Sequence, residues 1–129
     1  MKYLKAEEIL VIHARVIEET RGTHGVRDVG LLQSAAFRPQ TAIGGKEMYK
    51  SIFEKAAALF EALARFHVFV DGNKRTAVVS SARFLAINGF ELTITNIELE
   101  KFVLRAIESR LEVSEIALWL KKNSERIKK

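Results

Sequence analysis

Residues 53–88 read FEKAAALFEALARFHVFVDGNKRTAVVSSARFLAIN, and this stretch decides the fold. Apolar residues in its first half recur at helical spacing and form one stripe: Phe53, Ala56, Ala57, Phe60, Leu63, Ala64 and His67. A short break at residues 70–72 follows. A second helix is expected from about Asn73 to Asn88, because Asn88-Gly89 is a C-terminal signal. That helix is apolar almost all round, which predicts a buried central helix.

On the N-terminal side, the pattern predicts two more helices separated by a loop. The first has one apolar side and stops near Gly22; its apolar residues are Ile9, Leu10, Ile12, Val16 and Ile17. Residues 22–30 are rich in glycine and are expected to form a loop. Asp28 is a candidate N-cap for a short helix that Pro39 ends. Residues 39–47 are predicted to form a second loop around Gly44 and Gly45.

On the C-terminal side, residues 91–94 are predicted to form a short extended piece. Thr95 and Glu98 have the spacing of a capping box for the next helix. Ser114 is expected to cap the last helix, whose inward side chains include Trp119. Together these features predict a single all-α domain over residues 1–129, with about six helices.

Composition limits the function classes. The chain has 129 residues, a net charge of +5 and no cysteine, so disulfides, thiolate metal sites and cysteine nucleophiles are excluded. No apolar run reaches the roughly 18 residues of a membrane span, and residues 1–20 hold no secretory signal, so a cytoplasmic protein is expected. Residues 121–129 supply +4 of the charge, and the interpretation we favour is a solvated helix end.

The break between the two central helices carries the candidate chemistry. It reads His67-Val68-Phe69-Val70-Asp71-Gly72-Asn73-Lys74-Arg75. The start of a helix offers free N–H groups and the positive end of the dipole, which together attract anions. Lys74 and Arg75 add two cations there, although cations oppose the dipole at that end. Asp71 could hold Mg²⁺, which prefers carboxylates and substrate phosphates. A histidine, a carboxylate and an anion cradle within nine residues suit phosphoryl or nucleotidyl transfer.

Each of these residues also has an ordinary structural interpretation. His67 lies on an apolar stripe, where a lone histidine is more often a core residue. Asp71 alone would be a cap, Gly72-Asn73 a turn, and Lys74 with Arg75 a surface pair. Phe69 is expected to be a core anchor. The contiguity of the residues favours the chemical interpretation.

The string resembles the signature of the Fic/Doc family, H-x-F-x-[DE]-G-N-x-R, and Lys74 is typical of its death-on-curing (Doc) branch. Three further segments are similar to that branch: Gly25-Val26-Arg27-Asp28-Val29-Gly30-Leu31-Leu32, Arg38-Pro39-Gln40, and the helix end from Phe84-Leu85 to Asn88-Gly89. The resemblance therefore covers nearly the whole chain. It implies the helical Fic fold and the toxin of a toxin–antitoxin pair.

The resemblance also implies a role for each residue of the string. His67 matches the general base that takes a proton from a target hydroxyl. Asp71 matches the Mg²⁺ ligand, Gly72 and Asn73 match the anion hole, and Arg75 matches the phosphate-binding arginine. Lys74 replaces a glycine of AMP-transferring members. In the Doc branch, this difference accompanies transfer of the γ-phosphoryl group of ATP to a threonine of elongation factor Tu, which stops translation.

Other positions have weaker implications. Arg65 matches a basic position of the branch, with a surface role as the alternative. Residues 39–47 match a substrate-clamping flap, with an ordinary loop as the alternative. A metal site made of His13, His24 and His67 is not suggested by their spacing.

Departures from the family pattern leave the transferred group open. Gly72 is the residue of AMP-transferring members, where Doc proteins carry alanine. Val78, however, stands where AMP-transferring members place an arginine, and Val79 stands where Doc proteins can carry asparagine.

Three alternatives to a kinase stay open. They are AMP transfer to a protein hydroxyl, a non-catalytic module that holds a nucleotide or peptide, and a small basic DNA-binding protein. We expect no direct contact with nucleic acid, because outside the tail the net charge is only +1.

Control by a separate chain is also expected. Many Fic proteins carry an inhibitory [ST]-x-x-x-E-[GN] helix, and no Ser or Thr of this sequence has Glu four residues later. The resemblance therefore implies a small antitoxin acting in trans.

Overall fold

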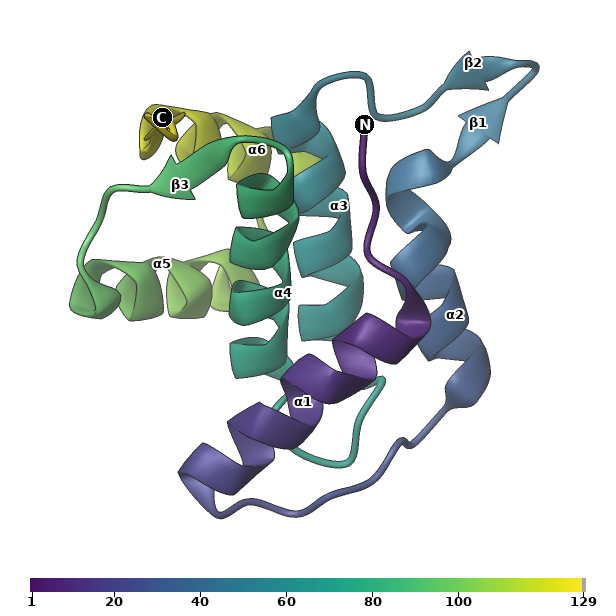
Figure 1. Cartoon of the computed structure of the whole chain (residues 1–129), viewed down its shortest axis with the longest axis vertical. Helices are drawn as coiled ribbons and strands as arrows, with labels where there is room; N and C mark the ends of the chain where they lie inside the picture. The colour runs from purple at the N-terminus through teal and green to yellow at the C-terminus, as the bar shows by residue number, and fades with distance from the viewer. Residues whose placement is uncertain (129) are drawn as a thin grey trace.

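Helices dominate the computed structural model, which describes residues 1–128 (Figure 1). The elements in chain order are α1 (Ala6–Thr20), α2 (Val29–Phe37), the 3-10 turn η1 (Arg38–Gln40), β1 (Ala42–Ile43), β2 (Lys46–Glu47), α3 (Ile52–Arg65), α4 (Asn73–Ile87), β3 (Phe90–Leu92), α5 (Asn96–Glu108), α6 (Val113–Lys122) and β4 (Ser124–Arg126). The predicted all-α fold of about six helices is confirmed. None of the helices described is long and apolar enough to span a bilayer.

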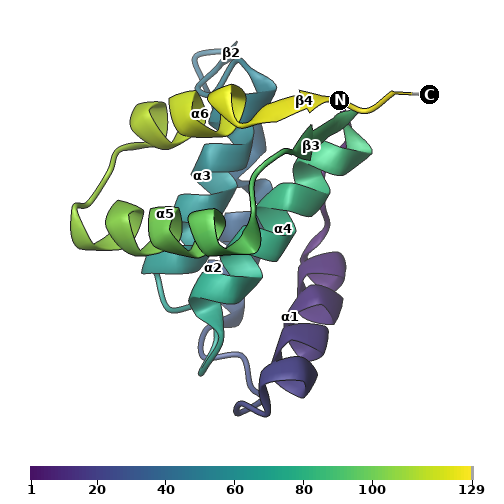
Figure 2. The same cartoon turned by 90° about the vertical axis from the view of Figure 1, so that its left-hand side faces the viewer.

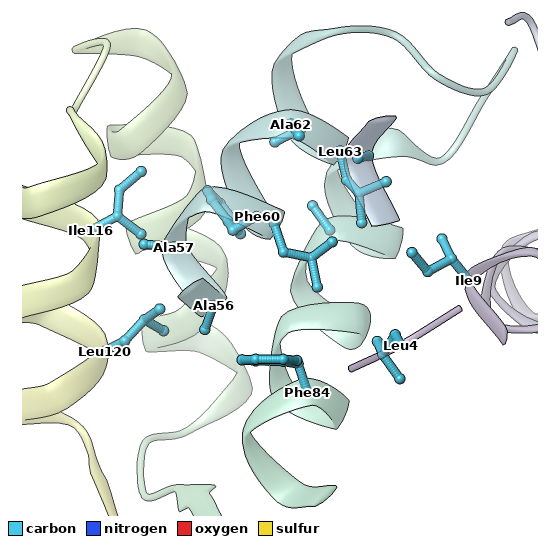
Figure 3. Packing of buried hydrophobic residues seen from close by; sticks show 14 of the residues in the cluster. Leu4, Ile9, Ala56, Ala57, Phe60, Ala62, Leu63, Phe84, Ile116 and Leu120 are labelled. Atoms are coloured by element: carbon cyan, nitrogen blue, oxygen red, sulfur yellow. The ribbon is translucent and has the colours of Figure 1, made fainter. Parts of the chain in front are cut away.

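The core is built around α3, which packs against α4 on one side and α6 on another, while α1 packs against α4. Figure 3 shows side chains packed around α3 from these helices and from the segment before α1: Leu4, Ile9, Phe84, Ile116 and Leu120. The helix after the break, α4, lies in the middle of the molecule as predicted (Figure 2). The prediction that this helix is buried is wrong for one side, where Val79 is 40% exposed and Arg83 is also exposed. Nine residues of α3 are buried but only six of α4, so α3 is the more buried helix.

The buried face of α1 differs from the predicted one at Leu10, Ile12 and His13, and Ile12 is only half-buried. Leu10 is 37% exposed, and His13 is buried in its place, at 3% exposure. The buried residues are Ile9, His13, Val16 and Ile17, which have the spacing of one helix face. Sequence periodicity missed His13 because histidine is not an apolar residue.

The C-terminal part corrects two predictions. Glu112, not Ser114, caps α6 and forms a capping box with Glu115. The basic tail is not simply a solvated helix end, because β4 follows α6 and pairs antiparallel with β3. The expected extended piece near residues 91–94 is thus a strand with a partner. Thr95 caps α5 as predicted, since its side chain accepts a hydrogen bond from the Glu98 N–H.

The predicted loop at residues 39–47 is ordered: Pro39 and Gln40 lie in η1, and residues 42–47 form a hairpin. Strands β1 and β2 pair antiparallel, and Gly44 and Gly45 turn between them with positive φ. Both views place this hairpin near the start of α3, whereas the break before α4 lies at the other end of that helix (Figures 1 and 2). A 14-residue helix is about 21 Å long, so the hairpin is remote from the motif and does not clamp a ligand there in this structure.

Two loops run side by side at the end of the molecule that holds the break (Figure 1). Val26 and Phe69 form an antiparallel bridge, and the Val70 N–H donates to the Gly25 carbonyl at 3.0 Å. The Arg27 and Asp28 N–H groups both donate to the carbonyl of Val68. The loop after α1, residues 21–28, therefore packs along the loop after α3 and supports it, and we call it the backing loop.

Candidate active site

His67 lies just beyond the end of α3 with a strained backbone. The helix ends at Arg65, Phe66 is its C-cap, and His67 has a φ of 50°, in the left-handed region. This region costs about 1–2 kcal/mol for a residue with a Cβ, so the surroundings must hold it there. His67 is exposed and is not a core residue, although its spacing continued the apolar stripe.

Beneath His67, the loop is anchored by Phe69 and His13. Phe69 is 1% exposed, which confirms its prediction as a core anchor. The His13 ring stacks on the Phe69 ring at a centroid distance of 3.8 Å. The Nε2 of His13 donates a hydrogen bond of 2.8 Å to the carbonyl of Asp71. A buried histidine from α1 therefore fixes both an anchor and a backbone carbonyl of the loop.

The side chain of Asn73 closes the loop. Its Oδ1 accepts from the Phe69 N–H, and its Nδ2 donates to the Phe69 carbonyl, both at 2.9 Å. This pair of bonds uses both ends of the amide. The side chain of Asn73 therefore holds the loop, and its backbone N–H is available to contribute to an anion hole.

Gly72 is required by the backbone. Its φ is 75°, and a Cβ added there would lie 3.0 Å from Cδ1 of Ile17 and 3.5 Å from Cγ1 of Val16. Glycine avoids both the conformational strain and the contact with α1. The identity of residue 72 is therefore explained by local structure, and it gives no independent support to AMP transfer.

The start of α4 is suited to an anion. Gly72 is the N-cap and makes no side-chain cap bond, and no acidic residue lies in the first turn. The first N–H groups of a helix have no partner within the helix, so those of Lys74 and Arg75 remain available to a ligand. Lys74 and Arg75 are exposed, and neither forms an ion pair with a residue in the range 1–128.

Asp71 is an exposed carboxylate held by two backbone groups. Its Oδ2 accepts from the Thr23 N–H at 3.0 Å, and its Oδ1 accepts from the Gly72 N–H at 2.8 Å. These two bonds, the Thr23 bond foremost, lower the pKa of Asp71 below its usual 3.8. The carboxylate therefore stays ionised at neutral pH, as a metal ligand must.

The donor set around Asp71 fits a nucleotide-bound Mg²⁺ rather than a resident metal. Within residues 1–128 no cluster of three or more His, Asp or Glu side chains could hold a metal ion. Mg²⁺ commonly takes one or two carboxylates and completes its shell with water and phosphate oxygens. Each oxygen of Asp71 accepts only one hydrogen bond and retains a lone pair for such a role.

Two cavities flank Lys74. One, of about 550 Å³, is lined by Ala64, Arg65, His67, Lys74, Ile107 and Arg110, and none of these residues is acidic. The other, of about 380 Å³, lies between α4 and α5 and is mainly apolar; its lining is Lys74, Arg75, Val78, Val79, Asn96, Leu99, Glu100, Val103 and Leu104. Lys74 belongs to both, so a ligand bound across it would contact His67 at one end and an apolar wall at the other.

Arg65 has a structural role at the rim of the first cavity. It forms an ion pair with Glu61 and donates to the carbonyls of Ala106 and Leu111, both at 2.7 Å. Its guanidinium thereby joins the end of α3 to the turn between α5 and α6. Arg110, in that same turn, has a φ of 49° and an exposed side chain without an ion pair to any described residue.

The predicted site residues lie together in the structure, and other residues hold them there that the sequence did not indicate. The structure places His67, Asp71, Gly72, Asn73, Lys74 and Arg75 in one loop and the first turn of α4. It also adds supports from elsewhere, namely His13, Thr23 and Arg27. His13 could have been found from its spacing to Ile9 and Val16. His24 is exposed in the backing loop, and no three-histidine site forms among the described residues.

Comparison with known proteins gives consistent matches. The model of the Fic/DOC family matches residues 3–85. The chain is 44% identical over 91 residues to "Toxin Doc" of Mycolicibacterium smegmatis, covering 70% of this chain and 68% of that protein. It is 32% identical over 117 residues to "Protein kinase doc" of Escherichia phage P1, covering 91% of both chains.

Proposed function

Because the chain belongs to the Fic/DOC family, we propose that it is a Doc-type toxin that transfers the γ-phosphoryl group of Mg-ATP to a Ser or Thr hydroxyl of a protein. The observation that carries this proposal is the cavity shared by His67 and Lys74, whose lining includes no acidic residue. A candidate base thus faces the same space as a cation that can hold the transferred phosphate. One relative, which matches 91% of this chain, is named "Protein kinase doc", and this name supports a phosphoryl group rather than AMP as the transferred group.

In the proposed reaction, the imidazole of His67 takes the proton from the acceptor hydroxyl. A bond forms between the hydroxyl oxygen and the γ-phosphorus, and the bond between that phosphorus and the β–γ bridging oxygen breaks, which releases ADP. Lys74, Arg75 and the free N–H groups at the start of α4 hold the phosphates and balance their charge. Asp71 would hold Mg²⁺, which would neutralise further phosphate charge.

We propose elongation factor Tu as the acceptor, as the family resemblance implies. The direct test incubates the purified protein with this factor and ATP labelled at either the γ- or the α-phosphate. We expect label on a Ser or Thr only from γ-labelled ATP. Label from α-labelled ATP would instead identify the protein as an AMP transferase, and label from neither would leave a binding module as the better description.

The matched variants in this experiment are His67→Ala and Lys50→Ala. Both residues are exposed, so both variants should fold normally. Removing a general base costs typically 10²–10⁴-fold in rate, so His67→Ala should lose transfer at that scale. Lys50→Ala should keep full activity, and transfer by His67→Ala at the wild-type rate would refute the proposed mechanism.

A further inference from the structure

The strained position of His67 raises the question of what holds it. Beyond the end of α3, the carbonyl groups of Phe66 and His67 point away from any helical partner. Unpaired carbonyls at a helix end normally need a side chain or water. In this structure one side chain, that of Arg27, donates to both of them.

Arg27 donates these two hydrogen bonds from two different nitrogens of its guanidinium group. Its Nε donates to the carbonyl of His67, and its Nη2 donates to the carbonyl of Phe66 at 3.0 Å. The planar guanidinium suits two acceptors side by side, whereas a lysine ammonium acts as a single point of charge. The contact also places a cation at the C-terminal end of α3, where the helix dipole favours positive charge.

The backbone of Arg27 is itself fixed, which makes the contact a rigid one. Its N–H donates to the carbonyl of Val68 at 2.9 Å, and Val26 bridges to Phe69. On the other side, Asp28 caps α2 by accepting from the Leu31 N–H at 3.0 Å. Arg27 therefore joins three structures: the start of α2, the backing loop and the residue proposed as base.

We propose that Arg27 is a positioning residue for His67. Arg27 holds the His67 backbone in its left-handed conformation and so directs the imidazole into the cavity that Lys74 and Arg110 also line. No ion pair to a carboxylate in the range 1–128 competes for the guanidinium. His13 supports the same loop at Phe69 and Asp71, two and four residues after His67, and its contacts do not involve Arg27. Loss of Arg27 should thus release His67 while the remainder of the loop stays anchored.

The kinetic consequence rests on the proposed transferase function. A misplacement of a reacting group by about 1 Å can cost on the order of 10²-fold in rate. We expect Arg27→Ala to lower kcat by a factor of this order, with a much smaller change in KM for ATP, because Lys74 and Arg75 are untouched. Arg27→Lys should recover only part of the loss. Millimolar guanidinium should partly restore Arg27→Ala and leave His67→Ala inactive.

A spectroscopic measurement tests the positioning itself, independently of any activity. The chain has three histidines, so ring signals of labelled protein can be assigned with single His variants. We expect Arg27→Ala to shift and broaden the His67 ring signals, with those of His13 unchanged. Arg83→Ala, which removes an exposed arginine of α4, serves as the control and should move neither.

The outcomes separate the two proposals. Unchanged His67 signals in folded Arg27→Ala would overturn the positioning role, and so would an unchanged kcat in an active enzyme. If the wild-type protein transfers nothing while Arg27→Ala still displaces the His67 signals, the proposed function fails and the positioning role stands. Should Arg27→Ala not fold, the same measurements on Arg27→Lys decide, since this variant keeps the charge and most of the side chain.

Discussion

At the residue scale, Gly72 shows how a motif position can be set by packing as well as by chemistry. The residue has a φ of 75°, and its missing side chain makes room for Ile17 and Val16. A Cβ would meet the flexible end of Ile17, which can move slightly. The strain of the backbone is therefore the larger part of the cost, and the contact adds to it.

This reasoning predicts the stability of two alanine variants. Gly72→Ala should lower the free energy of unfolding by about 1–2 kcal/mol, mostly from the left-handed backbone. Gly45→Ala is the matched control, because its φ is 78° and nothing lies within 4 Å of the added Cβ. Urea denaturation should show that Gly72→Ala is the more destabilised variant. Equal losses would mean that the contact with α1 carries no cost.

Asp71 leads to a prediction about acid pH. Because its pKa is lowered in the folded state, the unfolded chain binds the proton more readily, and ionised Asp71 stabilises the fold. That contribution is complete above the usual pKa near 3.8 and is lost as the pH falls through the lower folded value. Asp71→Asn does not titrate. In Mg²⁺-free buffer, the difference in Tm between wild type and Asp71→Asn should therefore shrink between pH 5 and pH 3. A difference that stays constant over this range would show that the two backbone bonds do not favour the ionised carboxylate.

At the element scale, the sequence predicted the helices well, but it did not predict the long-range side-chain contacts that hold the loop before α4. The stripe from Phe53 to Leu63 is a local pattern, and α3 follows it closely. By contrast, the contact of His13 with Asp71 joins residues 58 apart in the chain, and that of Arg27 with His67 joins residues 40 apart. Such pairings depend on tertiary packing, which the period of a single helix does not contain. The start of α6 was misplaced for a different reason: Glu112 and Glu115 form a capping box without a Ser or Thr at the cap.

The hairpin illustrates a further element that the sequence did not reveal. Lys55 of α3 is 1% exposed, and its Nζ donates to the carbonyls of Pro39 and Tyr49 and to the carboxylate of Glu47. This buried lysine attaches the base of the hairpin to α3. From the sequence, Lys55 is only a lysine within a predicted helix, and such a lysine is normally exposed.

Substitution of Lys55 tests whether the hairpin contributes to the activity of the candidate site. Lys55→Met removes the ammonium group and leaves the oxygens that accept its hydrogen bonds without a partner. This loss should lower the free energy of unfolding by about 1–3 kcal/mol. Its transfer activity, measured well below its Tm, should match that of wild type, because the hairpin lies near the start of α3 (Figure 1) and His67 lies beyond the other end of this helix. Lys50→Met changes an exposed lysine in the same region and should alter neither property. If Lys55→Met lost activity while it remained folded, the hairpin would have a role at the active site after all.

At the scale of the whole molecule, the distribution of charge separates the candidate site from the tail. Lys74 and Arg110 line the cavity of His67, while Arg126 of the basic tail lies in β4, the strand that pairs with β3. The positive charge at the cavity is thus available to phosphates or to an acidic partner.

This arrangement leads to a prediction about growth. The sequence carries no Ser or Thr followed by Glu four residues later, so that motif supplies no carboxylate to Arg75 from within these residues. A toxin with the proposed activity would need restraint from another chain, and a short segment that folds on binding would suit that role. We expect induced expression of the wild-type protein alone to arrest growth and protein synthesis. Co-expression with a small gene encoded beside it should restore both.

The matched variants decide whether the arrest comes from the chemistry. Expression of His67→Ala, at a level verified by immunoblot, should leave growth normal, and Arg83→Ala should arrest it like wild type. Arg27→Ala should fall between the two, because its base is present but displaced. If wild type at strong expression permits normal growth and translation, the toxin proposal is wrong. If His67→Ala arrests growth as fully as wild type, the toxicity arises from binding, and the anion site at the start of α4 rather than proton transfer at His67 would be its source.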